Sequence, residues 1–122
     1  MKEYLRIAVT GGRNHENSQL VFDVLYNVKH SIETVGAKIF LIVGGARGAD
    51  EQAEAWGVYN NVAMKVFHAD WDRYGNSAGP ARNRQMLMSG IDRLCAFPGG
   101  RGTSDMMKIC KNTGVWVVEY KV

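Results

Sequence analysis

The segment Phe97-Pro98-Gly99-Gly100-Arg101-Gly102-Thr103-Ser104-Asp105 decides how this chain folds. The apolar run before it, Leu94 to Phe97, is typical of a buried strand, and a helical pattern begins at about Thr103. Between them a proline and three glycines form a turn whose N–H groups can approach an anion closely, because glycine has no Cβ atom. The helix N-terminus behind the turn adds unpaired donors and a partial positive charge. The segment predicts either a phosphate-binding site or a tight turn without a ligand.

The remaining sequence alternates strand and helix patterns around this turn. Apolar runs predict strands over residues 5–9, 38–43, 62–67, 93–97 and 115–118. Helical periodicity, capping residues and terminating glycines predict helices over residues 20–32, 49–59, 79–89 and 103–112. The segment 68–78 has neither period and is expected to be an ordered loop. Strands that are apolar along their length and alternate with helices indicate a parallel sheet covered on both faces.

These patterns predict an α/β fold for residues 1–122, as a single Rossmann-like three-layer sandwich with a mainly parallel five-stranded sheet. No apolar run approaches the ~20 residues of a membrane span, and the N-terminus does not resemble a signal peptide. We therefore expect a cytoplasmic protein that does not contact membranes. Cys95 and Cys110 are expected to be buried thiols, and no Cys or His stands at metal-ligand spacing, so no metal site is predicted.

Glycine turns follow the first, second and fourth predicted strands. They are Thr10-Gly11-Gly12-Arg13, Gly44-Gly45-Ala46-Arg47-Gly48-Ala49-Asp50 and the segment quoted above. Because the carboxyl ends of parallel strands meet at one edge of a sheet, we expect the three turns to form one anion-binding crevice. None of them is a G-x-G-x-x-G or Walker A sequence, which weakens a dehydrogenase or ATPase interpretation.

Arginines are the candidate counter-ions for a bound anion. Arg82 and Arg84 lie in the first turns of the helix over 79–89 and point in different directions, and we expect Arg82 to face the crevice. Arg13, Arg47 and Arg101 either strengthen the positive field or face solvent. The net charge of +3 suits an anionic ligand, but no dense Lys/Arg stripe with interleaved aromatic residues favours nucleic acid.

Two carboxylates stand near the expected crevice. Asp50 and Asp105 lie in first helical turns, where they either complement the helix dipole or act as a general acid/base or ribose hydroxyl acceptor. Trp71 is expected to fill the core, and Tyr74 is a candidate to stack on a base or cover the pocket. His68 is expected to be a hydrogen-bonded structural residue, whereas His15 and His30 are expected at the surface.

With these residues assembled, the chain resembles the SLOG superfamily, the Rossmann-like group that includes the Smf/DprA and LOG proteins. The resemblance is greatest to the small YspA-like branch of bacteria and phages. The segments that carry the resemblance span nearly the whole chain in order: Thr10–Arg13, Val43–Asp50, Ala69–Trp71, Tyr74–Gly75, Ala78–Met86 and Ala96–Thr103.

The resemblance also implies an enzymatic alternative. LOG enzymes hydrolyse the N-glycosidic bond of a nucleoside 5′-monophosphate, with an arginine in R-K-x-x-M and a glutamate that ends P-G-G-x-G-T-x-x-E. Arg82 and Met86 match the first motif with Asn83 in place of lysine, and Met106 stands in the place of the glutamate. Asp105 would project about 100° away from that place on a helix. An enzyme of this kind would therefore use Arg82 and Asp105 as candidate catalytic residues.

The function predicted from the sequence is a binding module or sensor for a nucleotide or a nucleotide-derived phosphate. The alternatives are a LOG-like phosphoribohydrolase and, less favoured, DprA-like binding of single-stranded DNA. A homo-oligomer is expected from the LOG resemblance, no cofactor is assigned, and Mg²⁺ accompanying the phosphates stays open. The expected ligand-binding residues are Gly11, Gly12, Arg13, Gly44, Gly45, Ala46, Asp50, Arg82, Asn83, Pro98, Gly99, Gly100, Gly102 and Thr103.

Overall fold

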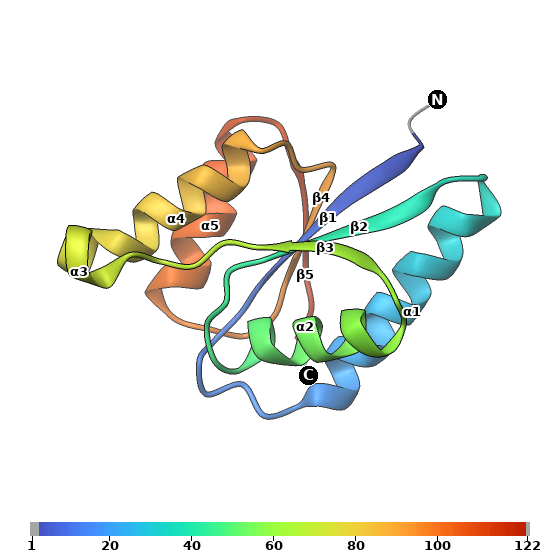
Figure 1. Cartoon of the computed structure of the whole chain (residues 1–122), viewed down its shortest axis with the longest axis horizontal. Helices are drawn as coiled ribbons and strands as arrows, with labels where there is room; N and C mark the ends of the chain where they lie inside the picture. The colour runs from blue at the N-terminus through green and yellow to red at the C-terminus, as the bar shows by residue number, and fades with distance from the viewer. Residues whose placement is uncertain (1–2, 122) are drawn as a thin grey trace.

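Apolar segments from both halves of the chain pair into one parallel sheet. In the computed structural model, which describes residues 3–121, the sheet has five strands in the order β3-β2-β1-β4-β5 (Figure 1). The strands are β1 (Tyr4–Thr10), β2 (Lys38–Val43), β3 (Ala63–Val66), β4 (Arg93–Ala96) and β5 (Trp116–Glu119). Every neighbouring pair is parallel, so the mainly parallel sheet predicted from the sequence is wholly parallel.

Helices cover both faces of the sheet. They are α1 (Ser18–Thr34), α2 (Ala49–Tyr59), α4 (Ala78–Met88) and α5 (Arg101–Asn112). Figure 1 shows α1 and α2 on one face and α4 and α5 on the other. Successive residues of a strand point to opposite faces, and β1 divides its side chains between two cores accordingly. Ile7 and Val9 pack with α1 and α2, whereas Ala8 packs with Met86 of α4 and Met106 of α5. The α/β sandwich predicted from the sequence is confirmed.

The segment after β3 differs from the prediction. Instead of a loop without helix, residues 68–78 contain the one-turn helix α3 (Trp71–Tyr74) and a 3-10 turn over Gly75–Ser77. Asp70 caps α3 by accepting a hydrogen bond from the Arg73 N–H at 3.1 Å. A helix this short has no apolar period in its sequence. The expectation for Trp71 is also wrong, because its side chain is 48% exposed and Trp56 is the tryptophan buried in the core.

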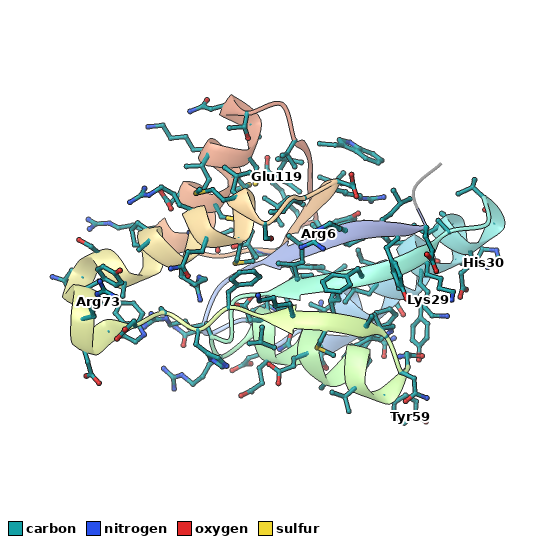
Figure 2. The ribbon with its side chains drawn as sticks, turned by 45° about the horizontal axis from the view of Figure 1, so that its top comes forward. Arg6, Lys29, His30, Tyr59, Arg73 and Glu119 are labelled. Atoms are coloured by element: carbon teal, nitrogen blue, oxygen red, sulfur yellow. The ribbon has the colours of Figure 1, made fainter. Side chains whose placement is uncertain are left out.

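Smaller differences concern the histidines and one helix start. His30 lies at the surface as expected, near the end of α1 (Figure 2). His15 is instead half-buried, with its Nδ1 2.9 Å from Oε1 of Gln52. Helix α5 begins at Arg101, two residues before the predicted start, with Gly100 as its N-cap. Cys95 and Cys110 are buried free thiols, as the sequence predicted.

No helix in residues 3–121 has the length and apolar character that crossing a bilayer requires.

The loops after β1, β2 and β4 meet at one edge of the sheet and are joined through the backbone of Gly12. The Gly12 N–H donates to the Pro98 carbonyl at 2.9 Å, and the Gly12 carbonyl accepts from the Ala49 N–H at 3.2 Å. A Cβ atom on Gly48, whose φ is +76°, would lie 2.1 Å from the Gly12 oxygen. A Cβ atom on Gly99 would lie 2.6 Å from the Gly12 nitrogen. The three loops therefore pack backbone against backbone.

Replacing Gly48 with alanine is expected to lower the free energy of unfolding by about 3–5 kcal/mol, because the new Cβ adds steric overlap to an unfavourable φ. Gly114→Ala is the matched control, since Gly114 has φ +80° but open space around its Cα within the described residues. The control is expected to lose about 1–2 kcal/mol. Urea unfolding of both variants measures the difference. Equal losses would show that packing against Gly12 adds nothing to stability.

Candidate ligand-binding crevice

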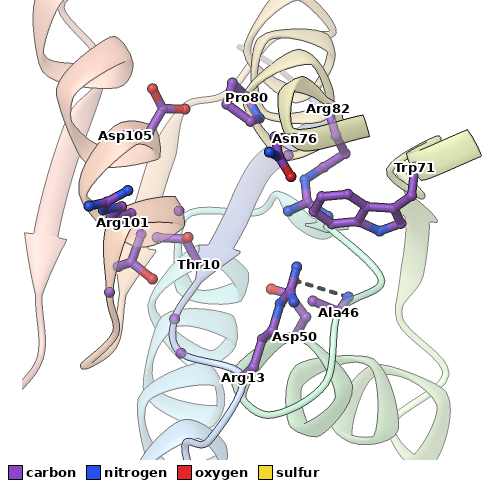
Figure 3. A pocket seen from close by; sticks show the side chains of 16 residues that line it. Thr10, Arg13, Ala46, Asp50, Trp71, Asn76, Pro80, Arg82, Arg101 and Asp105 are labelled. Atoms are coloured by element: carbon purple, nitrogen blue, oxygen red, sulfur yellow. Dashed lines mark hydrogen bonds between the residues drawn. The ribbon is translucent and has the colours of Figure 1, made fainter. Parts of the chain in front are cut away.

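A cavity of about 570 Å³ lies at the carboxyl edge of the sheet. The strand order reverses there, because β2 and β3 lie on one side of β1 whereas β4 and β5 lie on the other. We call this cavity the main cavity. Its walls come from the loop after β1, the N-termini of α2 and α5, and the segment from α3 to α4 (Figure 3). Ten residues singled out in the sequence line it: Gly11, Gly12, Arg13, Ala46, Asp50, Arg82, Gly100, Gly102, Thr103 and Asp105. Their roles in binding remain a prediction.

The other predicted site residues lie elsewhere. Gly44 and Gly45 line an adjoining cavity of about 330 Å³, which we call the side cavity. Pro98 and Gly99 line a separate hollow beside the segment from Gly12 to Asn17. Gly99 has a structural reason to be glycine, since a Cβ there would lie 2.2 Å from the Thr103 hydroxyl oxygen. Asn83 of α4 is buried, and its Nδ2 donates hydrogen bonds to Gly102 and Asp105 of α5, which line the main cavity.

Several lining residues were absent from the predicted set. They are Thr10, Trp71, Asn76, Gly79, Pro80 and Arg101. The charge of Arg101 was recognised in the sequence, and Trp71 was assigned to the core instead. Asn76 lies in the 3-10 turn before α4, and Gly79 and Pro80 lie in the first turn of α4, where the sequence indicates only the start of a helix. Tyr74, a candidate for base stacking, lines neither the main nor the side cavity among the residues described.

The N-terminus of α5 presents bare backbone to the main cavity. Within residues 3–121, no side chain caps this helix, and its first internal hydrogen bond runs from the Ser104 N–H to the Gly100 carbonyl at 3.0 Å. A Cβ atom on Gly100 or Gly102 would meet no described atom within 4 Å. Unpaired N–H groups and the positive end of the helix dipole thus face open space. This is the arrangement that binds phosphate at helix N-termini.

Arg82 occupies the boundary between the two cavities and lines both. Its Nη1 donates to the Gly44 carbonyl, and its Nε donates to Oδ1 of Asn83 at 3.2 Å. Burial lowers the pKa of the Arg82 guanidinium, an effect that the nearby Asp50 carboxylate opposes. Arginine stays protonated in proteins, so the crevice contains a cation fixed in position. Arg84 is exposed and lines neither cavity among the described residues.

Asp50 is a buried carboxyl group in the first turn of α2, only 5% exposed. Burial raises its pKa from 3.8 to about 6, although Arg82 and the amides of Ala46 and Gly44 oppose this shift. Its Oδ2 accepts the Ala46 N–H at 3.3 Å, the dashed line in Figure 3. Its Oδ1 is buried without a hydrogen-bond partner among the residues described. A carboxylate that is buried in this way destabilises the fold.

Asp105 is the acidic group that α5 presents to the main cavity. Its Oδ2 accepts a hydrogen bond from Nδ2 of Asn83 at 3.0 Å, and the same Nδ2 lies 3.2 Å from the Gly102 carbonyl. Met106, which stands in the place of the LOG glutamate, is fully buried in the core between α4, α5 and the sheet. The helix rotation expected between these two positions therefore directs residue 105, and not residue 106, to the crevice.

Arg13 and Trp71 form part of the rim shared by both cavities. The Arg13 guanidinium carbon lies 5.1 Å from the centroid of the Trp71 ring, within the range of a cation–π contact. Figure 3 shows both side chains beside the opening, with Arg82 behind the tryptophan. Residues 3–121 contain no cluster of three or more His, Cys, Asp or Glu side chains that would hold a metal ion.

The wholly parallel, doubly wound sheet and the crevice at its switch point define a Rossmann-like α/β protein. Residues 5–74 match the sequence model of the YspA, cpYpsA-related SLOG family. The chain belongs to this family, as the sequence resemblance predicted.

Three known proteins are similar to this chain in sequence or in structure. Gene 61 protein of Mycobacterium phage D29 is 35% identical in an alignment 122 positions long, and the alignment covers 94% of this chain and 95% of the phage protein. The X-ray structure of TM1055 is similar with a TM-score of 0.68 at 16% identity, over 93% of this chain and 72% of that one. DNA processing protein A (DprA) from Streptococcus pneumoniae gives a TM-score of 0.54 at 16% identity, over 94% of this chain and 58% of DprA. At such identities, the two structures show the fold alone.

The raised pKa of Asp50 predicts a pH-dependent stability. A carboxyl group with a higher pKa in the folded state stabilises the fold when protonated, and this contribution is lost as pH rises from about 4 to above 6. The full loss corresponds to about 3 kcal/mol. Asp50→Asn is therefore expected to be more stable than the parent at pH 8, and its advantage should shrink by about 1–2 kcal/mol at pH 5.

Urea unfolding at pH 5 and pH 8 measures this difference. Glu51→Gln is the matched control, because Glu51 is the next residue of α2 and is exposed. A pH-dependent change of the same size in Glu51→Gln, or none in Asp50→Asn, would contradict the assignment to Asp50.

Proposed function

We propose that this protein binds a nucleotide or a nucleotide-derived phosphate in the main cavity, as a sensor or binding module. The observation that carries the proposal is the open N-terminus of α5 on one side of a cavity that has the fixed guanidinium of Arg82 in its wall. Backbone N–H groups and a guanidinium together provide the donors that phosphate oxygens accept. The cavity volume of about 570 Å³ suits a ligand of nucleotide size.

The phosphate of such a ligand would lie at the first turn of α5. Gly100, Gly102 and Thr103 offer backbone donors there, and the absence of Cβ atoms at the two glycines allows close approach. Arg82 has one Nη1 hydrogen bond to the Gly44 carbonyl, which leaves further guanidinium N–H groups for the ligand. Arg82 is thereby oriented before binding, which lowers the entropic cost of the contact.

The remainder of the ligand would extend toward the rim. Asp50 and Thr10 are buried polar residues that line the cavity, and they provide polar atoms for sugar hydroxyl groups. Trp71 is half exposed at the rim, where its flat ring offers a stacking surface for a base. The family membership and the fold are consistent with a nucleotide-related role.

A second candidate function is hydrolysis of the N-glycosidic bond of a nucleotide. The observation that favours it is the placement of Asp105 in the wall of the main cavity, with its orientation fixed by Asn83. Cleavage of an N-glycosidic bond passes through an oxocarbenium-like state, which a nearby carboxylate stabilises. Arg82 would hold the 5′-phosphate. The C–N bond would break with its electron pair going to the base, water would bond to the sugar carbon, and the proton that this water loses would go to the base.

Arg82→Gln is expected to weaken binding of AMP or ribose 5-phosphate by about 10- to 100-fold, because a charge-assisted hydrogen bond contributes about 1.5–3 kcal/mol. Arg84→Gln, on the same helix but exposed, is the matched control and should bind like the parent. Isothermal titration calorimetry measures the affinities, and thermal unfolding of the free proteins checks that both variants fold. Equal affinity in the two variants would contradict the proposed role of Arg82.

Asp105→Asn distinguishes the binding module from the hydrolase. If the parent releases free base from AMP, the substitution is expected to reduce turnover by at least about 100-fold while affinity changes little. Chromatography of the incubated nucleotide measures the released base. Binding by the parent without any released base excludes hydrolysis of this nucleotide and leaves the binding module. Tight binding of an oligonucleotide with a steep salt dependence would instead favour the DNA-binding alternative.

A further inference from the structure

We infer that the side cavity is a second anion-binding site, so that the ligand carries a second acidic group in addition to the phosphate held at α5. This inference rests on the proposed function and specifies its ligand class: a phosphorylated sugar or nucleotide with two separately bound phosphate groups. The two sites would lie on either side of Arg82, which lines both cavities.

The lining of the side cavity is cationic. Its charged or titratable residues are Arg13, Arg47, His68 and Arg82, and no carboxylate of the described chain lines it. The main cavity differs, because Asp50 and Asp105 contribute to its walls. A concave surface with charges of one sign concentrates counter-ions and attracts a ligand of opposite charge. The side cavity therefore selects for an acidic group, while the main cavity also suits hydroxyl groups.

These basic residues come from separate parts of the fold. Arg13 follows β1, Arg47 follows β2, His68 follows β3, and Arg82 lies on α4. Their convergence is therefore a consequence of the tertiary fold and not of one charged helix face. Neither Arg13 nor Arg47 forms an ion pair within residues 3–121. Burial and, to a smaller extent, the positive charge of Arg13 lower the pKa of Arg82, whereas the Asp50 carboxylate opposes this shift.

The backbone brings His68 to the cavity wall. Gly45 has φ +70°, and a Cβ atom there would lie 2.6 Å from Nδ1 of His68. A larger residue at position 45 would therefore displace the ring. His68 makes no hydrogen bond with the described residues, contrary to its expected structural role, and its side chain is exposed. The absence of a protein partner leaves its ring nitrogens available to a ligand.

The two cavities share part of their wall, as one ligand that reaches both would require. Arg13, Ala46, Trp71 and Arg82 line both of them, and Figure 3 shows these four side chains around the same opening. A ligand with one phosphate at α5 can thus extend past Arg82 and place its second acidic group near Arg47 and His68. A monophosphate would leave the side cavity without an anion.

The test compares bisphosphates with their monophosphate parents by isothermal titration calorimetry. Adenosine 3′,5′-bisphosphate is paired with AMP, and ribose 1,5-bisphosphate is paired with ribose 5-phosphate. At least one bisphosphate is expected to bind about 10-fold or more tightly than its parent. The variant Arg47→Gln/His68→Gln should lose that gain while binding of the monophosphates stays unchanged.

Arg84→Gln is again the matched control and should retain the gain, and thermal unfolding of the free variants confirms that they are folded. The inference is overturned if neither bisphosphate binds more tightly than its parent, or if the gain survives in the double variant. In both cases, binding of the monophosphates by the parent would leave the proposed function intact. If neither monophosphates nor bisphosphates bind, the proposed function itself is contradicted.

Discussion

The peptide groups on either side of Gly12 connect the three loops on which the crevice depends. The N–H of this residue bonds to the loop after β4, and its carbonyl bonds to the start of α2. These contacts require backbone to approach backbone, which explains why Gly48 and Gly99 cannot carry a Cβ atom without displacing Gly12. The parallel sheet brings the loops to one edge, and the Gly12 contacts hold them there. The N-terminus of α5 and the buried side chains of the crevice are positioned by this connection.

The sequence was sufficient to predict the layers of the fold, because strand and helix patterns alternate clearly and the strands are apolar along their length. It also predicted the edge at which the glycine turns meet. It could not assign a role to each glycine. Gly99 serves contact between loops, whereas Gly100 and Gly102 leave the backbone open to the cavity. These roles depend on which atoms lie opposite each Cα, and local sequence does not contain that information.

The segment from α3 to α4 was the least predictable part of the crevice. Helix α3 is too short to produce a helical period. Tryptophan is commonly a core residue, but Trp71 in this helix lies at the rim of the crevice with its side chain half exposed. The choice between positions 105 and 106 required the rotation of α5, which the core contacts of Met106 determine. The hydrogen bond from Asn83 to Asp105 joins residues 22 positions apart in the sequence. It depends on how α4 and α5 pack together, which the local sequence does not contain.

The atoms that maintain the shape of the crevice are not the atoms that determine its chemical character. Gly11, Gly12, Gly100 and Gly102 line it with backbone atoms alone, whereas Trp71, Arg82 and Asp105 line it from the surrounding helices. Substitutions in these helices can change the ligand without disturbing the loop contacts. The identity of the ligand can therefore change while the loops keep their positions.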